Sequence, residues 1–271
     1  MYPVTYHRPQ DLAEAAALFA ASDDASYLSG GHTLLPTMKQ RLAAPSDLID
    51  LSGIGAMRGI SLENGVLSIG AFTPHGEVAA SPIVQGAIPA LAGLAGSIGD
   101  RHVRHRGTIG GSVANNDPAA DYPSGLLGLG AAVITDRREM IADDFFVSLY
   151  ETALEPGEIV VRIAFPVPAG AGYAKFRSLA SRYAVAATFV ARTPEGTRVA
   201  VTGAGASGVF RLADFEAALD RDFSPEALTG LSVDPGLLMA DSNGSAEYRA
   251  NLIAVMARRA VRNMGRAVLY K

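Results

Sequence analysis

One segment, residues 107–121, constrains the fold and the chemistry of this chain more than any other. It reads Gly-Thr-Ile-Gly-Gly-Ser-Val-Ala-Asn-Asn-Asp-Pro-Ala-Ala-Asp. Glycines lack a Cβ atom, so the backbone can turn sharply and approach a ligand closely. Successive N–H groups in such a loop can bind an anion without a cationic side chain. A tight turn between strands is the simpler interpretation, but the length of the segment and its Ser and Asn side chains favour a phosphate-binding loop.

A second glycine-rich segment of the same character lies far upstream, at residues 27–36. It reads Tyr-Leu-Ser-Gly-Gly-His-Thr-Leu-Leu-Pro, so a short apolar run leads into Gly-Gly and a hydroxyl residue. Neither segment is a P-loop, because no Gly-Lys-Ser/Thr follows the glycines. Together the two segments predict a diphosphate held from both sides.

These residues resemble the paired flavin motifs of the FAD-binding medium subunit of molybdenum hydroxylases, the aerobic carbon monoxide dehydrogenase and xanthine dehydrogenase family. The similarity rests on Ser29-Gly-Gly-His-Thr-Leu-Leu-Pro, on Thr108-Ile-Gly-Gly-Ser and on Asp117-Pro-Ala-Ala-Asp-Tyr-Pro. It covers most of the chain and is strongest over residues 1–185. Two motifs at compatible spacing are more specific than either alone.

The resemblance implies an α+β fold in three parts. A two-part FAD-binding domain of the vanillyl-alcohol-oxidase/p-cresol-methylhydroxylase type comes first, followed by a C-terminal antiparallel sheet with helices. We place an N-terminal α/β subdomain at residues 1–53, a second α/β subdomain at 54–166 and the C-terminal domain at 167–271. The cluster of Pro166, Pro168 and the glycines that follow is a plausible boundary.

Local patterns predict individual elements. Asp11 before the Ala- and Leu-rich residues 12–21 predicts a capped helix. Asn64-Gly65 between apolar runs predicts a hairpin, and Thr73 before Pro74 predicts another helix cap. The other expected strands are 3–8, 25–28, 48–51, 59–63, 66–69, 126–135, 158–166, 172–178, 185–193 and 197–202, and the other expected helices are 34–42, 82–95, 212–220 and 246–264.

The predicted diphosphate site combines both glycine-rich segments. Backbone N–H groups are expected to donate most of the hydrogen bonds, with Ser and Thr hydroxyls assisting. Asp121 is not expected against the diphosphate, because like charges repel in a desolvated site; it would accept hydrogen bonds from ribose hydroxyls or backbone donors, or serve only as a helix-start carboxylate. The diphosphate residues are Gly30, Gly31, His32, Thr33, Thr108, Gly110, Gly111 and Ser112.

Further positions are implied by the resemblance alone. Lys175 matches a lysine near the flavin ring, and Tyr183 matches an aromatic residue over the ring, our one candidate catalytic residue. A surface lysine and a packing tyrosine are the alternatives. Asp117 also matches the cofactor motif, although it fits a helix cap. The other implied FAD contacts are Leu28, Ser29, Leu34, Ile98, Ile109 and Val160.

Two further sequence patterns resemble functional motifs but have simpler interpretations. Asp100, His102 and His105 could suggest a metal site, but two imidazoles three residues apart on an extended segment converge poorly. We therefore interpret residues 100–107 as a solvated basic segment beside an anion site and expect no metal ligands. Residues 203–208 fit G-x-G-x-x-G after a strand, yet too little chain remains for a doubly wound sheet, so we predict a turn.

Composition excludes several classes of function. The absence of cysteine rules out iron–sulfur clusters held by this chain's own thiolates. A net charge of −4 gives no basis for nucleic-acid binding. We find no apolar signal core and no apolar run approaching the ~20 residues of a membrane span. The sequence predicts a cytoplasmic protein that reaches a membrane only through partners.

The chain offers no catalytic acid–base pair, no Ser/His/Asp arrangement and no molybdenum ligands. The resemblance implies an electron-transfer subunit with noncovalent FAD. A large subunit would carry the molybdenum cofactor, a small subunit would carry [2Fe-2S] clusters, and the assembly would be a dimer of heterotrimers passing electrons to NAD or a quinone. The alternatives are a stand-alone flavin-dependent oxidoreductase of related fold and a flavin-free assembly protein. The substrate stays open.

Overall fold

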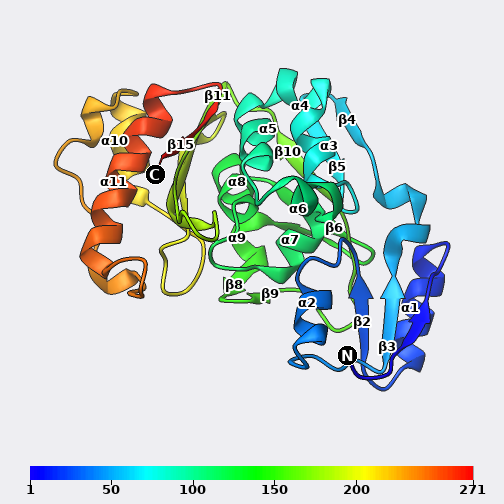
Figure 1. Ribbon diagram of the computed structural model, residues 1–271. Helices are drawn as coiled ribbons and strands as arrows, with labels where there is room; N and C mark the ends of the chain where they lie inside the picture. The colour runs from blue at the N-terminus through cyan, green and yellow to red at the C-terminus, as the bar shows by residue number, and fades with distance from the viewer. Residues whose placement is uncertain (271) are drawn as a thin grey trace.

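The computed structural model describes residues 1–270 and has three main β-sheets arranged along the molecule (Figure 1). A small N-terminal sheet stands at one end and a C-terminal sheet at the other, with a group of helices and a second sheet between them. This mixed helix-and-sheet architecture confirms the α+β fold class.

The N-terminal sheet is parallel and follows the predicted β-α-β-α-β order. Its strands lie in the order β1-β3-β2, which requires crossover connections. Asp11 Oδ1 accepts a hydrogen bond of 2.8 Å from the Glu14 N–H, so the predicted cap of the first helix is confirmed. The elements are β1 (Thr5–His7), α1 (Leu12–Ala21), β2 (Ala25–Leu28), α2 (Leu34–Lys39) and β3 (Asp47–Asp50).

The second sheet is antiparallel, with strand order β4-β5-β10-β6-β7. The predicted hairpin joins β4 to β5, and Asn64 and Gly65 both adopt the positive φ angles that such a turn requires. Its strands are β4 (Ile60–Glu63), β5 (Val66–Gly70), β6 (Ala132–Thr135), β7 (Glu139–Ile141) and β10 (Val160–Pro166), and β8 (Phe146–Ser148) pairs with β9 (Glu151–Thr152) beside it.

The middle of the chain is more helical than its sequence predicts. The helices are α3 (His75–Ala80), α4 (Pro82–Ala87), α5 (Pro89–Gly96), α6 (Arg101–Arg106), α7 (Ile109–Asn115), α8 (Tyr122–Leu129) and α9 (Ala142–Phe145). Short 3-10 turns occupy Leu51–Gly53 and Gly55–Met57.

Four local predictions in this region are wrong. The expected helix 82–95 is interrupted before Pro89, which cannot donate the next helical hydrogen bond. Thr73 caps no helix, because its hydroxyl bonds to the backbone of Gly59 instead. Residues 126–129 belong to α8 rather than to a strand. The expected extended segment 100–107 is helix α6, capped by Asp100.

The C-terminal sheet has strand order β14-β13-β12-β11-β15. Its pairs are antiparallel except β11–β15, which is parallel, and β15 is not among the strands predicted from the sequence. The elements are β11 (Gly170–Arg177), β12 (Ala184–Thr193), β13 (Gly196–Thr202), β14 (Phe210–Arg211), α10 (Ala213–Arg221), α11 (Ala246–Arg262) and β15 (Ala267–Tyr270), with 3-10 turns at Glu226–Leu228 and Pro235–Leu237.

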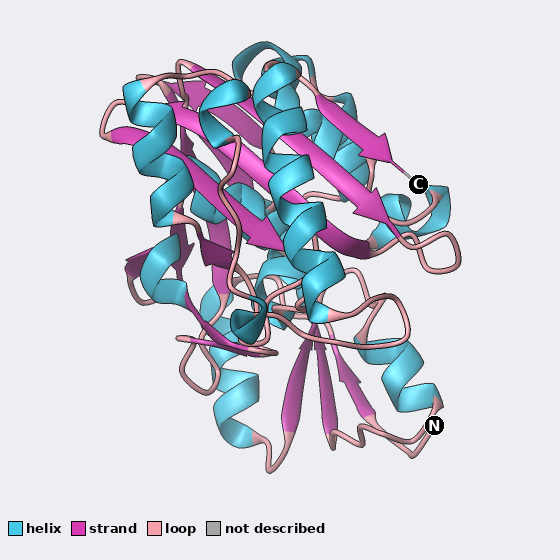
Figure 2. Ribbon diagram, turned by 90° about the vertical axis from the view of Figure 1, so that its left-hand side faces the viewer, coloured by secondary structure: helices cyan, strands magenta, loops and turns pink. Residues whose placement is uncertain are grey.

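Two apolar cores lie on opposite faces of the C-terminal sheet. Helices α10 and α11 cover the outer face (Figure 2), where Phe215, Ile253 and Met256 are buried. The other face presents Tyr173 and Phe189 to a core shared with α5 and α8. That core continues through the second sheet to the N-terminal unit, so the three sheets form one packed body. The expected domain boundaries, near residues 53 and 166, stay a prediction.

Within residues 1–270, no helix combines the length and the apolar character needed to cross a bilayer.

Arg249 is a charged side chain buried between α11 and the C-terminal sheet, with 2% of its surface exposed. Its Nη1 donates to the carbonyls of Val185 and Gly203, both at 2.5 Å, and its Nη2 donates to Asp241 at 2.6 Å. These bonds tie the helix to the ends of β12 and β13.

We expect Arg249→Met to lower the free energy of unfolding by about 1–3 kcal/mol, because two buried carbonyls lose their donor. Asp241→Asn serves as the matched control and should cost less than about 1 kcal/mol, since that carboxylate is partly exposed. Urea denaturation of both variants checks this, and equal effects would contradict it.

Candidate cofactor-binding site

A cavity of about 800 Å³ opens where the three parts of the chain meet. Its walls come from the loop after β2, from the region of α6 and α7, from residues 154–160 and from β11 with the loop that follows it. The volume falls within the range of small-molecule and cofactor sites. The cavity is therefore the candidate functional site.

The two glycine-rich segments meet in the wall of this cavity. A Cβ atom on Gly30 would lie 2.2 Å from the Arg106 carbonyl oxygen and 2.7 Å from Gly107 Cα, so a side chain at residue 30 is excluded. The hydroxyls of Ser29 and Thr108 are 2.7 Å apart and share a hydrogen bond. Segments 79 residues apart in sequence thus form one surface, as the sequence predicts.

The first segment presents free backbone donors to the cavity. The N–H groups of Gly30, Gly31, His32 and Thr33 donate no hydrogen bond to any residue among 1–270, and all four residues line the cavity. Backbone N–H groups without a protein partner require an outside acceptor. A run of such groups can bind an anion such as a phosphate.

The second segment behaves differently from the predicted loop. Residues 109–115 form helix α7, with Thr108 as its N-cap. The amides of Ile109 and Gly110 donate to the carbonyls of Thr73 and Ala71, at 3.1 and 2.8 Å. Those of Gly111 and Ser112 donate to the hydroxyl and the carbonyl of Thr108. These four donors are already used within the protein. That this backbone cradles the diphosphate therefore stays a prediction, and these hydrogen bonds do not favour it.

Two polar side chains of the second segment also line the cavity. Ser112 and Asn115 line the cavity, and neither side chain hydrogen-bonds to another described residue. Ser112 is in the predicted set, whereas Asn115 is a residue that we missed. Treating 109–115 as a helix would have placed both on one face, because residues three apart are neighbours on a helix.

Nearly all of the predicted site residues line the cavity. The exception is Ile109, whose side chain is fully buried in the core, so its role is to anchor α7. Gly110 lines the cavity but is required mainly for packing, since a Cβ there would lie 2.4 Å from Ala71 Cβ. The predicted residues that line the cavity are Leu28, Ser29, Gly30, Gly31, His32, Thr33, Leu34, Ile98, Thr108, Gly110, Gly111, Ser112, Asp117, Asp121, Val160, Lys175 and Tyr183.

Asp121 and Lys175 form a buried ion pair in the cavity wall. Lys175 Nζ donates to Asp121 Oδ2 at 2.9 Å, and the Tyr173 hydroxyl donates to Oδ1. The lysine is 1% and the aspartate 5% exposed. Residues 173 and 175 project from the same face of β11, which brings both donors to one carboxylate. Lys175 is thus no surface lysine, and the negative charge of Asp121 is balanced within the protein.

Asp117 and Tyr183 line the cavity and are less buried than the Asp121–Lys175 pair. Asp117 Oδ1 accepts a hydrogen bond from the Ala119 N–H, which makes a turn rather than the expected helix cap. Tyr183 is half exposed although it lines the cavity. Its hydroxyl pKa is raised by partial burial and by the nearby Asp117 carboxylate, so the phenol stays protonated.

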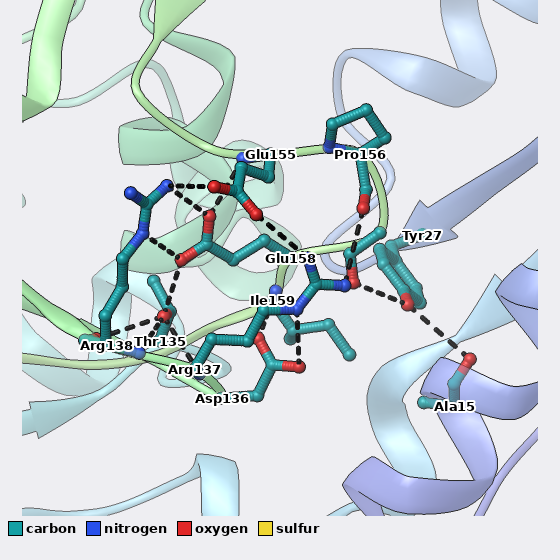
Figure 3. Close-up of polar contacts among 11 residues, drawn as sticks. Ala15, Tyr27, Thr135, Asp136, Arg137, Arg138, Glu155, Pro156, Glu158 and Ile159 are labelled. Carbon is teal, nitrogen blue, oxygen red and sulfur yellow. Dashed lines mark hydrogen bonds and ion pairs between the residues drawn. The ribbon is translucent and has the colours of Figure 1, made fainter.

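A polar network fixes the wall at residues 154–160 (Figure 3). Glu158 accepts hydrogen bonds from Arg138, from the Thr135 hydroxyl at 2.7 Å and from the Glu155 N–H at 2.8 Å. The guanidinium of Arg138 is the main reason that the pKa of Glu158 falls to about 2. On the other side, the Tyr27 hydroxyl donates to the Gly157 carbonyl at 3.2 Å, which joins this wall to the N-terminal unit.

The two sequence patterns that resemble functional motifs take structural roles. The Asp100 carboxylate accepts from the amides of His102 and Val103. In the part of the chain that the structure describes, no three His, Asp or Glu side chains gather closely enough to hold a metal ion. Residues 203–208 form the predicted turn, which here connects the antiparallel strands β13 and β14.

This fold and this cavity are those of a cofactor-binding protein, and the cavity wall carries neutral hydrogen-bond donors that have no partner among residues 1–270. Residues 2–168 match the family described as the FAD binding domain in molybdopterin dehydrogenase. The chain belongs to this family and is an FAD-dependent oxidoreductase subunit.

Relatives of known structure or curated function agree. The chain is 36% identical to the carbon monoxide dehydrogenase medium chain of Afipia carboxidovorans, over 94% of each chain. It is 31% identical to the nicotine 6-hydroxylase medium subunit of Paenarthrobacter nicotinovorans, over 97% of each. It also superposes on the carbon monoxide dehydrogenase of Hydrogenophaga pseudoflava with a TM-score of 0.86 and 35% identity, covering 97% of this chain and 98% of that one.

The buried ion pair between Asp121 and Lys175 should contribute to the stability of the fold. Lys175→Met leaves Asp121 as an unpaired buried charge, so we expect the free energy of unfolding to fall by about 3–5 kcal/mol. Adding Asp121→Asn removes that charge and should recover part of the loss. Lys39→Met, at an exposed lysine, is the control and should change stability by less than about 0.5 kcal/mol. A single variant at residue 175 as stable as wild type would overturn the pairing.

The hydrogen bonds of Glu158 should make the stability of the fold depend on pH. Because the folded pKa lies below the unfolded one, this carboxylate stabilises the fold above pH ~4.5, and its contribution is lost as pH falls towards about 2. Glu158→Gln should therefore be less stable than wild type at pH 7, with the difference shrinking between pH 4.5 and 2. Chemical denaturation at stepped pH measures it. A difference independent of pH would contradict this account.

Proposed function

We propose that this chain is the FAD-carrying electron-transfer subunit of a heterotrimeric molybdenum hydroxylase. It takes electrons from iron–sulfur clusters of a small partner subunit and delivers them to an external acceptor, NAD or a quinone. Membership of the family supports the flavin and the oxidoreductase role. The relatives' designations as medium chains or subunits of dehydrogenases and hydroxylases support the division of labour between subunits.

One observation carries the cofactor assignment. Residues 30–33 line the cavity of about 800 Å³, and none of their four backbone N–H groups has a hydrogen-bond partner among residues 1–270. The neutral hydroxyl of Ser112 and the amide of Asn115 face the same cavity from α7. This donor set fits a diphosphate, whose oxygens are acceptors only, better than it fits a metal or a neutral substrate.

The chain's own residues would bind, orient and shield the cofactor. The backbone of residues 30–33 would hold the diphosphate, and the apolar side chains of Leu28, Ile159 and Val160 would cover less polar parts. Bound FAD would supply the electron chemistry, since it can accept and release electrons singly or in pairs. Lys175 would stabilise negative charge developing near it, with Asp121 limiting the size of that effect.

The proposal also includes four details of the site and of the assembly. They are the contact of Tyr183 with the flavin ring, the contact of Asp121 with ribose hydroxyls, the molybdenum cofactor on a large subunit, and a dimer of heterotrimers. A location in the cytoplasm, with membrane contact only through partners, stays a prediction.

The cofactor is tested by the flavin content of the purified chain and its affinity for added FAD. The wild-type chain should bind FAD noncovalently in about equimolar amount. Gly30→Ala should bind FAD at least about tenfold more weakly, because the new Cβ pushes the two segments apart. Gly86→Ala is the matched control, since a Cβ there meets no atom within 4 Å. Wild type without affinity for FAD would contradict the proposal.

The assembly is tested by mass measurement of the native complex. Co-purification of two further subunits together with molybdenum supports the heterotrimer. A lone chain that retains FAD and oxidises donors by itself would instead indicate a stand-alone flavoenzyme, and a complex without flavin would indicate an assembly protein.

A further inference from the structure

His75 is a buried histidine in the cavity wall for which the sequence offered no role. It is the first residue of α3, and 4% of its surface is exposed. Its Nδ1 atom is sealed from solvent and has no hydrogen-bond partner among residues 1–270. Buried polar atoms without partners are rare, and each one requires an explanation.

The position of the ring ties His75 to the second glycine-rich segment. Its backbone N–H donates to the Gly107 carbonyl at 2.9 Å, and a Cβ on Gly107 would lie 2.7 Å from His75 Nε2. The imidazole therefore occupies the space that a side chain at residue 107 would take. Gly107 in turn touches Gly30, so His75 stands directly behind the meeting point of the two segments.

The orientation of the imidazole is fixed from its other side. The buried ring of Tyr122 packs against it with centroids 5.4 Å apart. Since His75 lines the cavity and Nδ1 is sealed, the polar atom available to the cavity is Nε2.

The proton of the neutral ring can be assigned from this geometry. An orphaned N–H is less well tolerated in a protein interior than an orphaned lone pair. The sealed Nδ1 is then the bare lone pair, and Nε2 carries the hydrogen. Burial, assisted by the positive surroundings of His32 and Arg104, lowers the pKa of His75 to about 3, so the ring is neutral near pH 7.

From this arrangement we propose that His75 is a cofactor-binding residue whose Nε2–H donates a hydrogen bond to a diphosphate oxygen of the bound dinucleotide. The inference rests on the proposed FAD function. It adds a donor from α3 to those of residues 30–33 and of Ser112, and it places that donor where the two glycine-rich segments converge. A neutral donor there recognises the diphosphate without adding a charge to the buried site.

The test compares His75→Phe with His75→Gln in the full-length chain. Phenylalanine keeps the ring but removes the donor, whereas the glutamine amide can present an N–H close to the position of Nε2. FAD and ADP are the probes, because both carry the diphosphate and only FAD carries the flavin. We expect His75→Phe to lose about 10- to 100-fold in affinity for both probes, the range for a hydrogen bond to a charged group. His75→Gln should bind both probes with an affinity within about threefold of wild type. That change is smaller than the roughly tenfold loss expected when one hydrogen bond is removed.

Thr188→Val is the matched control, because the Thr188 hydroxyl is also buried with no partner among residues 1–270 but does not line the cavity. It should leave FAD and ADP affinity unchanged. Unchanged affinity in His75→Phe would overturn the proposal, as would a loss confined to FAD. Equal losses in the Phe and Gln variants would indicate a packing role and would also overturn it.

Failure of this inference is separable from failure of the proposed function. If wild type binds FAD and His75→Phe binds it equally well, only the role of His75 is wrong. Should the Phe variant not fold, the imidazole ¹⁵N spectrum of the histidine-labelled wild type gives the answer. A protonated Nε2 whose signal shifts on ADP binding supports the contact, and an Nε2 signal unaffected by ADP overturns it.

Discussion

The contact between Gly30 and the backbone of residues 106–107 is the constraint on which the rest of the site depends. No side chain fits there, because a Cβ on Gly30 would lie 2.2 Å from a carbonyl oxygen. The close approach brings the loop after β2 against the start of α7. Residues 30–33 line the cavity there, and their amides have no acceptor among residues 1–270. The N-terminal unit and the middle unit thus make one binding surface that neither has alone.

Four charged or titratable groups buried in the cavity wall are either paired or neutral. Lys175 and Asp121 neutralise each other in the wall, and the pKa of His75 is low enough to keep its ring neutral. Glu158, in the wall at residues 154–160, is paired with Arg138. A doubly charged diphosphate would then be held by oriented neutral donors, which need no counter-charge and little reorganisation. The family to which the chain belongs gives this donor set its natural ligand, FAD.

The sequence predicts the positions of the site better than their conformations. Both glycine-rich segments reach the cavity, because Gly-Gly flanked by hydroxyl residues is a local signal for close backbone approach. The helical state of residues 109–115 was missed, since two glycines disfavour a helix. That preference is overridden by the Thr108 cap and by hydrogen bonds to residues 71 and 73. Such tertiary bonds cannot be read from a local window. The same reason explains why the sequence does not reveal the pairing of Asp121 with Lys175, which lie 54 residues apart. It also explains why the position of His75 in the cavity wall is not predicted.

The most direct measurement of the central claim is residue-resolved amide hydrogen exchange of the chain with and without FAD. The account predicts that the amides of residues 30–33 exchange rapidly in the free chain and become strongly protected when FAD binds. The amides of residues 109–112, already bonded within the protein, should be protected in both states. Protection gained at residues 109–112 but not at 30–33 would contradict the account.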